Sequence, residues 1–442
     1  MNLNYYNNTA TMVEHNGTKI LFDPWLVGKA YYGSWTSYPE LDIDMKSFDD
    51  VDYIHISHIH PDHCHEETLK MISNDIPILI HNWDNKFVKM NLERMGKNVI
   101  EMEHGDSFKL SDGFELYVYA ADGCDPKECF KFFGCGKMTP LDKSVGIDTF
   151  SVLTTGDKKI IQINDCQFPL TEKTITDVKS KFGDIDLLLV GYTGAGSYPQ
   201  CWIDYSDDDK INKYGEIKRQ KFLDWGMGFL DILKPKHYMP YAGTYTLCGP
   251  MGELEKFKCT PELPDALEYF TNHYGSGGFL LNPKESFDLV TEEVSAEYQH
   301  YDVEERYDYI KNILSKEKLD YDDDHDVSLY DVMELVPKAY KRYDKKRKEL
   351  SFVTDIDIYI DLPNNKLLKI FGDESGYDVI DYTDNRGNHF SYSLNPKLFY
   401  RLLKGPKYAH WNNAEIGSHI RFSRYPEVYQ RKLTYSMNFF HS

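Results

Sequence analysis

One short segment constrains this chain more than any other: residues 55–65 read HISHIHPDHCH and place five histidines and one aspartate within eleven positions. Side chains two residues apart in an extended chain point to the same side, so His58 and His60 converge. The proline that follows forces a turn, after which Asp62 and His63 project from the turn or from the start of a helix. Imidazole and carboxylate ligands suit zinc, iron or manganese. The segment therefore predicts a metal centre.

Short apolar runs that alternate with turn signals surround this segment and indicate an α/β fold. Strands followed by helices favour a sandwich of two sheets with helices outside. We expect a metal-binding domain over residues 1–289, a charged helical linker region over 290–350 and a smaller C-terminal α+β unit over 351–442. Strands are expected at 18–22, 53–57, 78–80, 114–120, 149–153, 160–163, 187–190 and 356–362, and helices at 66–71 and about 218–233.

Composition narrows the classes of partner. The chain has 50 Lys and Arg against 71 Asp and Glu, a formal charge of −21. Such a charge repels phosphate backbones and anionic lipid, so we expect neither a nucleic-acid nor a membrane partner. The first residues contain no readable signal peptide and no apolar run is long enough to span a bilayer, which predicts a cytoplasmic protein. Eight cysteines in 442 residues are too few for a disulfide scaffold.

The pattern His-x-His-x-Asp-His is the signature of the metallo-β-lactamase superfamily, and its surroundings resemble that superfamily as well. The segment LFDPW resembles the strand that ends in Asp-Pro, and Asp165, at the end of KKIIQIND, resembles the bridging carboxylate. This resemblance implies an αββα sandwich in which His58 and His60 hold one metal ion, Asp62 and His63 hold another, and Asp165 lies between them. From the residues alone, Asp165 can also be a turn carboxylate after a strand.

Two positions depart from the superfamily pattern. Where the third-motif histidine is usual, the sequence offers Asp122, Cys124 and Asp125 as candidate ligands. The last motif reads MPYAGTY, with Tyr241 at the usual histidine position, and His237 lies upstream, where it could bind a metal only if the chain bends back. A site with fewer histidines and more carboxylates is harder, which favours iron or manganese over zinc.

Two further features have weaker interpretations. Gly194 and Gly196 in GYTGAG follow a buried strand, and glycines there can offer backbone N–H groups to a substrate phosphate, although a tight turn is the simpler explanation. Cys124, Cys129 and Cys135 lie on one segment, CDPKECFKFFGC, and could bind a cluster or supply a ligand. Their spacing matches no standard framework, so ordinary thiols are the simpler interpretation.

One family shares these departures. Over almost its whole length the chain resembles the catalytic part of CMP-N-acetylneuraminate hydroxylase, a monooxygenase. The segments that carry the resemblance, in order, are FDPWLVGKAYYGSW, NDCQFP, GYTGAGSYPQ, KPKHYMPYAGTY and IGSHIRFSRYPEVYQRKL. That family begins with a Rieske domain, whose cluster needs Cys-x-His pairs, and these 442 residues contain no such pair.

We therefore expect an enzyme with two metal ions, iron favoured and zinc or manganese possible. It would be a monooxygenase that hydroxylates an activated small substrate, for which a nucleotide-linked molecule is one candidate, with Asp62 and Tyr241 as catalytic residues. Electrons would come from a separate donor protein or from the substrate.

Two alternatives stay open at this stage. The first is a hydrolase of the same fold, in which metal ions activate water against a phosphodiester, lactone or amide and Asp62 orients the nucleophile. The second is a non-catalytic binding protein, because fold alone does not give function. The C-terminal unit could cover the metal cleft or mediate oligomerisation.

Overall fold

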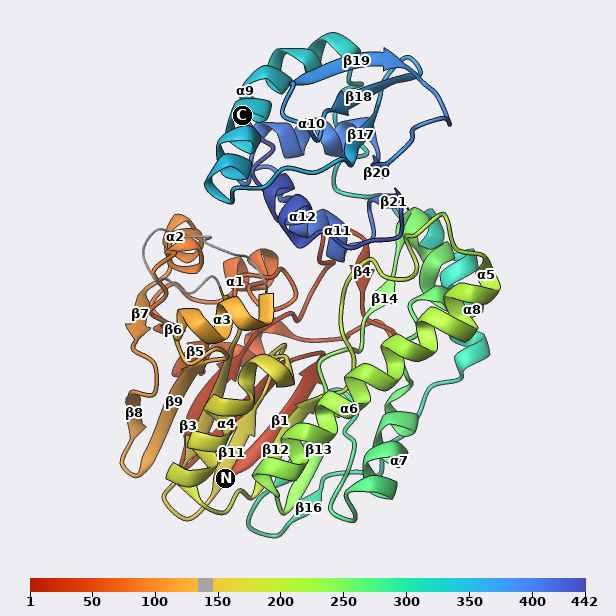
Figure 1. The fold of residues 1–442 in the computed structure, drawn as a ribbon. Coiled ribbons are helices and arrows are strands. Elements are labelled where there is room, and N and C mark those ends of the chain that lie inside the picture. Colours follow the sequence, from red (N-terminus) through yellow and green to blue (C-terminus); the bar gives the residue numbers. More distant parts are fainter. Residues whose placement is uncertain (134–145) are drawn as a thin grey trace.

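The structure is a computed structural model that describes residues 1–133 and 146–442. Among these residues, two β-sheets pack face to face with helices on their outer faces, and a smaller unit lies across one end (Figure 1). This αββα sandwich with an added α+β unit is the fold class that the sequence predicts. Cys135 lies outside the described residues.

The first sheet combines an antiparallel half with a parallel half. Because the carboxyl ends of parallel strands meet at one edge, the residues that follow β3 and β5 lie side by side there, with Asp23 N bonded to His55 O at 3.0 Å. Its strand order is β16 (Glu293–Val294), β15 (Ser286–Asp288), β1 (Asn2–Asn7), β2 (Ala10–His15), β3 (Thr18–Phe22), β5 (Tyr53–His55), β6 (Ile78–His81) and β7 (Val99–Met102).

The second sheet faces the first across an apolar interior. Val13 and Phe22 from the first sheet share one buried cluster with Leu116, Leu189 and Met239 from the second. Its strand order is β13 (His237–Tyr241), β12 (Leu187–Gly191), β11 (Lys159–Gln162), β10 (Thr149–Thr154), β9 (Phe114–Ala120) and β8 (Ser107–Ser111). The residues that follow β11 therefore lie at a strand end next to β12 and β13.

Helices cover the outer faces of both sheets. Leu69 of α1 and Leu92 of α2 pack in a cluster behind the first sheet, and Phe229 of α6 and Phe270 of α7 pack behind the second. Helix α1 begins directly after the histidine-rich segment because His65 caps it, accepting a hydrogen bond from Thr68 N. The helices of this part are α1 (Glu66–Met71), α2 (Phe87–Arg94), α3 (Pro126–Phe133), α4 (Phe168–Phe182), α5 (Asp207–Asp209), α6 (Glu216–Leu233), α7 (Leu263–His273) and α8 (Val303–Asn312).

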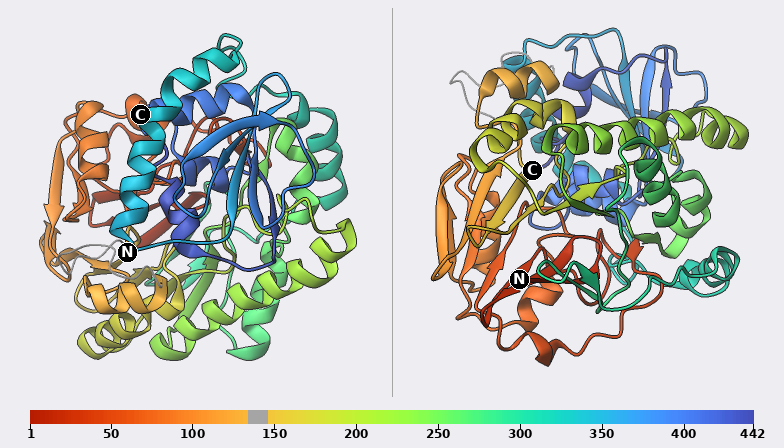
Figure 2. Two further views of the ribbon diagram at one scale, coloured as in Figure 1. Left: turned by 45° about the horizontal axis from the view of Figure 1, so that its top comes forward. Right: turned by 90° about the horizontal axis from the view of Figure 1, so that it is seen from below.

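The C-terminal unit rests on the end of the sandwich, with α11 and α12 toward it (Figures 1 and 2). Trp25 and Trp35 of the sandwich side lie in the same buried cluster as Phe399 and Trp411 of this unit, so one core serves both. Its sheet has the order β19 (Tyr377–Asp381), β18 (Lys366–Ile370), β17 (Asp357–Leu362), β20 (His389–Ser393) and β21 (Arg421–Tyr425), and its helices are α9 (Leu329–Glu349), α10 (Pro396–Lys404), α11 (Trp411–Ile416) and α12 (Arg431–Met437). A short pair, β4 (Trp35–Thr36) and β14 (Thr246–Leu247), lies beneath it.

The predicted strands and helices are present, with ends shifted by a few residues. For example, the strand expected at 53–57 ends at His55, and the helix expected from about 218 begins at Glu216. Helix α9 falls in the predicted linker region but packs on α10 and α12 of the C-terminal unit. In the part of the chain that the structure describes, no helix has both the length and the apolar character needed to cross a membrane.

The shared core predicts cooperative unfolding of the whole chain. Phe399 is fully buried in it, and Phe399→Ala should lower the free energy of unfolding by about 3–5 kcal/mol through lost contacts and a residual cavity. Calorimetry should show one transition that moves to lower temperature. Phe87→Ala, at a side chain that is 60% exposed, should leave the transition in place. Two transitions, of which Phe399→Ala moves only one, would contradict the shared core.

Candidate metal centre

The first set of candidate ligands combines two histidines of the loop after β5 with Asp165, which follows β11. His58 Nε2 is 2.9 Å from His60 Nδ1 and 3.8 Å from Asp165 Oδ2, and the three residues each offer one ligand atom within 4.8 Å of the other two. Ligand atoms about 2.0–2.2 Å from a common ion in a tetrahedral arrangement lie roughly 3–3.5 Å apart. The spacing of this first set is therefore suited to a single metal ion.

The second set lies beside the first and shares Asp165 with it. His63 Nε2 is 3.5 Å from Asp62 Oδ2 and 3.3 Å from Asp165 Oδ1. The two carboxylate oxygens of Asp165 thus face different sets. His63 Nε2 is buried, and among the described residues it has no hydrogen-bond partner. A buried ring nitrogen that faces two carboxylates at 3.3 and 3.5 Å is positioned as a metal ligand would be.

The charges at the centre also favour a cation. Burial alone would lower the pKa of His63, but the surrounding carboxylates, Asp62 and Asp165 foremost, raise it well above its ordinary value. Burial lowers the pKa of His58 well below its ordinary value, and neighbouring imidazoles lower it further. Asp23 and Asp62 are almost fully buried. A buried group with several carboxylates and at most one imidazolium has surplus negative charge, which divalent ions would offset.

Each ligand of the second set is held by a further residue. Asp23 Oδ2 lies 2.9 Å from His63 Nδ1, which fixes the hydrogen on Nδ1 and leaves Nε2 as the ligand atom. Tyr31 donates a hydrogen bond to Asp62 Oδ1 at 2.7 Å, and Asn8 Nδ2 donates to Asp62 Oδ2 at 2.9 Å. Both oxygens of Asp62 are therefore fixed before any ion arrives.

Asp165 is positioned by a strained turn. The residue before it, Asn164, has a φ of 52°, in the left-handed region that Asn tolerates better than most residues. Tyr241 stabilises this conformation: its hydroxyl donates to Asn164 Oδ1 at 2.6 Å and accepts from Asn164 N at 2.8 Å. The Tyr241 hydroxyl hydrogen is thus directed at Asn164 and not at the cluster. These contacts give Tyr241 the role of holding the turn that presents Asp165, and a catalytic role for Tyr241 stays a prediction.

The structure does not bring His237 to the cluster. His237 begins β13 and Tyr241 ends it, so His237 lies roughly 13 Å along the strand from the position near the centre. Its Nε2 is 3.4 Å from Glu292 Oε2 instead. A strand cannot bend back in the way that a ligand role for His237 requires.

Of the three third-motif candidates, Asp125 and Cys124 have partners outside the ligand sets. Asp125 accepts a hydrogen bond from Lys127 N at 2.9 Å at the start of α3 and pairs with Lys173 at 3.3 Å. Cys124 Sγ lies 3.3 Å from His81 Nε2, and burial together with nearby carboxylates raises the pKa of its thiol to about 12. Neither contacts the two ligand sets. Asp122 is buried and accepts from Cys124 N at 3.0 Å.

Sequence reasoning missed Asp148. This residue precedes β10, and its carbonyl accepts a hydrogen bond from Ala121 N at 2.9 Å, which places it beside Asp122. Burial and then the charge of Asp165 raise the pKa of Asp148 to about 7, so this carboxyl belongs to the electrostatic surroundings of the centre. The sequence does contain a signal for this residue. If the predicted strands at 114–120 and 149–153 pair antiparallel, the residue before the second strand lies beside the residue after the first.

The glycine segment has a packing explanation. A Cβ on Gly194 would lie 1.9 Å from the Phe222 ring, so only glycine allows this close approach. The Gly196 carbonyl accepts from Gln200 Nε2. Contact of these glycines with a substrate phosphate stays a prediction.

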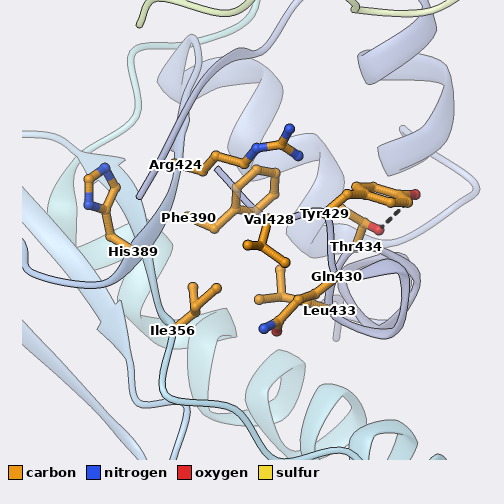
Figure 3. Close-up of a pocket in the computed structure, with 9 residues that line it drawn as sticks. All are labelled: Ile356, His389, Phe390, Arg424, Val428, Tyr429, Gln430, Leu433 and Thr434. Atoms are coloured by element: carbon orange, nitrogen blue, oxygen red, sulfur yellow. Dashed lines mark hydrogen bonds between the residues drawn. The ribbon is translucent and has the colours of Figure 1, made fainter. Parts of the chain in front are cut away.

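A small crevice lies elsewhere, within the C-terminal unit (Figure 3). Phe390, Val428 and Leu433 line it, Arg424 lies at its rim, and the Tyr429 and Thr434 hydroxyl groups are 3.4 Å apart. It is mainly apolar and separate from the ligand sets, so it does not compete with them as the centre of chemistry.

The role of Tyr241 can be tested at one atom. Tyr241→Phe leaves the buried Asn164 groups without their partner and frees the Asp165 turn, so we expect metal affinity, measured by chelator competition, to fall by about 10-fold or more. Tyr238→Phe is the matched control, because the Tyr238 hydroxyl lies on the same strand but donates to Gly275 O at 2.7 Å. Equal affinities in both variants and the unmodified chain would contradict the assignment.

Comparison with known proteins found one family match and several related sequences. Residues 2–125 match the family model of the beta-lactamase superfamily domain. A protein from Mycolicibacterium smegmatis named as a Rieske 2Fe-2S iron-sulfur protein is 26% identical over 287 residues, which cover 63% of this chain and 52% of the relative. The cytidine monophosphate-N-acetylneuraminic acid hydroxylase of Danio rerio is 25% identical over 274 residues, which cover 60% of this chain and 42% of that protein.

Solved structures give a weaker likeness. CmlA, a diiron beta-hydroxylase from Streptomyces venezuelae, aligns with a TM-score of 0.42 and 16% identity over 65% of this chain and 53% of its own. An isothiocyanate hydrolase from Delia radicum gut bacteria aligns with a TM-score of 0.44 and 15% identity over 65% of this chain and 99% of its own. Scores this low carry no argument about function.

The sequence motifs indicated a resemblance to the hydroxylases over almost the whole chain. The alignment with the Danio rerio protein covers 60% of the chain. Conversely, the chain spans about half the length of the curated relatives it matches. Residues 2–125 thus match the beta-lactamase superfamily domain, and over 60% of its length the chain resembles a CMP-N-acetylneuraminate hydroxylase.

Proposed function

We propose that this chain is a metalloenzyme whose two-metal centre hydroxylates an activated small substrate. The observation that supports this most is the position of Asp165, whose two oxygens lie 3.8 Å from His58 Nε2 and 3.3 Å from His63 Nε2, in different ligand sets. A carboxylate between two sets of ligands is suited to bridging two ions. His58 and His60 would hold one ion, and Asp62 and His63 the other.

Iron is the metal that we favour. Asp62 and Asp165 lie within the ligand sets, Asp122 and Asp148 lie near them, and neither the third-motif nor the last-motif histidine is present at its usual place. Hard oxygen ligands shift preference from zinc toward iron or manganese. A bound pair of iron ions would supply the binding and reduction of O₂.

The protein's own contribution would be rigid positioning. Tyr31 and Asn8 fix Asp62, and Asp23 fixes His63, so these ligands need little reorganisation when ions bind. Asp165 has an open face, since its side chain is 33% exposed whereas that of His63 is fully buried. We therefore place the substrate on the Asp165 side, where Gly194 and Gly196 could meet a phosphate.

Substrate and electron supply follow from the relatives. The hydroxylases that resemble this chain act, by their name, on cytidine monophosphate-N-acetylneuraminic acid, so a nucleotide-activated N-acyl substrate is our first candidate. Other relatives are named as Rieske proteins. Because these 442 residues contain no Cys-x-His pair, we propose that electrons reach the centre from a donor outside them.

A redox experiment tests the oxygenase directly. Protein produced with iron and zinc both available should contain iron. Its optical spectrum should bleach on anaerobic reduction and return when O₂ is admitted, because two irons at a bridged site can deliver electrons to O₂.

The competing hydrolase predicts the opposite outcome. Zinc as the only metal, with a spectrum that responds neither to reductant nor to O₂, would contradict the oxygenase and direct the work to phosphodiester and lactone substrates. Tyr31, Asn8 and Asp23 would position the ligands in the same way in either case.

A further inference from the structure

One side chain of the C-terminal unit contacts a candidate metal ligand directly. Asn412, in the first turn of α11, has its Oδ1 2.9 Å from His60 Nε2, across 352 positions of sequence. The other ring nitrogen of His60, Nδ1, lies 2.9 Å from His58 Nε2 and faces the ligand set. The two nitrogens of one imidazole therefore face a helix of the C-terminal unit on one side and the candidate metal position on the other.

The chemistry of imidazole makes this arrangement directional. A neutral imidazole ring has a hydrogen on only one of its two nitrogens, and the nitrogen that binds a metal must be the one without it. The Asn412 oxygen can only accept, so it holds the hydrogen on Nε2 and leaves the Nδ1 lone pair free. Among metal-bound histidines, a partner of this kind on the second nitrogen fixes both tautomer and ring orientation.

Helix α11 is itself held firmly. His410 caps it, accepting from Asn412 N at 3.3 Å, and His410 N donates to the Tyr32 hydroxyl at 2.7 Å. Trp411 is buried, and its indole donates to Phe440 O at 3.0 Å. Asn412 therefore projects from a backbone that is fixed on both sides, so its side chain can determine the position of His60.

A second contact joins the same unit to the other ligand set. His419 Nε2 donates to Tyr31 O at 2.7 Å, and Tyr31 in turn donates to Asp62 Oδ1 at 2.7 Å. The Tyr321 hydroxyl lies 2.9 Å from His419 Nδ1 and completes the orientation of that ring. Both ligand sets are thus supported from the C-terminal unit.

We propose that Asn412 is a positioning residue of the metal centre, which holds His60 in the tautomer and orientation that present Nδ1 to an ion. The C-terminal unit is then a part of the centre and not only a cover over it. This inference rests on the proposed function, because it takes the cluster to bind metal.

Metal affinity tests the proposal. Asn412→Leu removes the acceptor at similar volume, and we expect Co²⁺ affinity to fall by about 10- to 100-fold, with a change in the visible spectrum of the bound ion. Asn412→Asp keeps an acceptor and should bind Co²⁺ at least as tightly as the unmodified chain. Asn388→Leu is the control in the same unit, where the lost amide donates to Asp355 at 2.7 Å and contacts no ligand; it should bind normally.

A measurement on the metal-free chain keeps the proposal testable if Asn412→Leu folds poorly. With ring-¹⁵N histidine, the His60 signal, assigned by its loss in His60→Gln, should report the Nε2–H tautomer and should shift toward a mixture in Asn412→Ala. Unchanged Co²⁺ affinity and an unchanged tautomer in the Asn412 variants would overturn the inference. Failure of the unmodified chain to bind any metal would instead overturn the proposed function.

Discussion

The structure depends on a concentration of buried negative charge. Asp23, Asp62 and Asp165 surround His63, and His58 is buried in a neutral form beside them. Unpaired carboxylates are costly in the interior, so such a group is stable only with a cation among its members. In the absence of metal the His63 ring, whose pKa is raised, supplies one positive charge, and two divalent ions would supply more. Strand ends, turns and hydrogen bonds at this edge of the sandwich all serve to keep these groups together.

The second constraint is the core that the sandwich and the C-terminal unit share. Trp35 stacks on Tyr245 with ring centroids 3.4 Å apart, and Tyr31 lies 4.3 Å from Trp35 in the same cluster. Tyr31 also reaches Asp62, so packing between the two units and the orientation of a ligand are coupled through one side chain. Loss of the C-terminal unit would therefore affect the centre by packing as well as through Asn412.

Much of this arrangement follows from sequence patterns that are local. The spacing of His58, His60 and His63 predicts convergence because a short extended segment and a turn fix it. The role of Asp165 as a bridging carboxylate is predicted from the resemblance, because this residue comes at the end of a buried strand. The partners of these residues depend on tertiary structure. Asn412 is 352 residues from His60, and the Tyr241 hydroxyl contacts Asn164 where the backbone of Asn164 is in the left-handed conformation. No periodicity or spacing encodes such contacts.

The most direct test of the account is the metal content of the purified chain. Mass spectrometry of dialysed protein should give about two ions per chain, because Asp165 lies between two ligand sets. Asp165→Ala should retain fewer than one, since both sets lose a ligand, whereas His237→Ala should retain the full content. A single ion per chain in the unmodified protein that survives Asp165→Ala, or no metal at all, would contradict the bridged two-metal centre on which the proposed oxygenase depends.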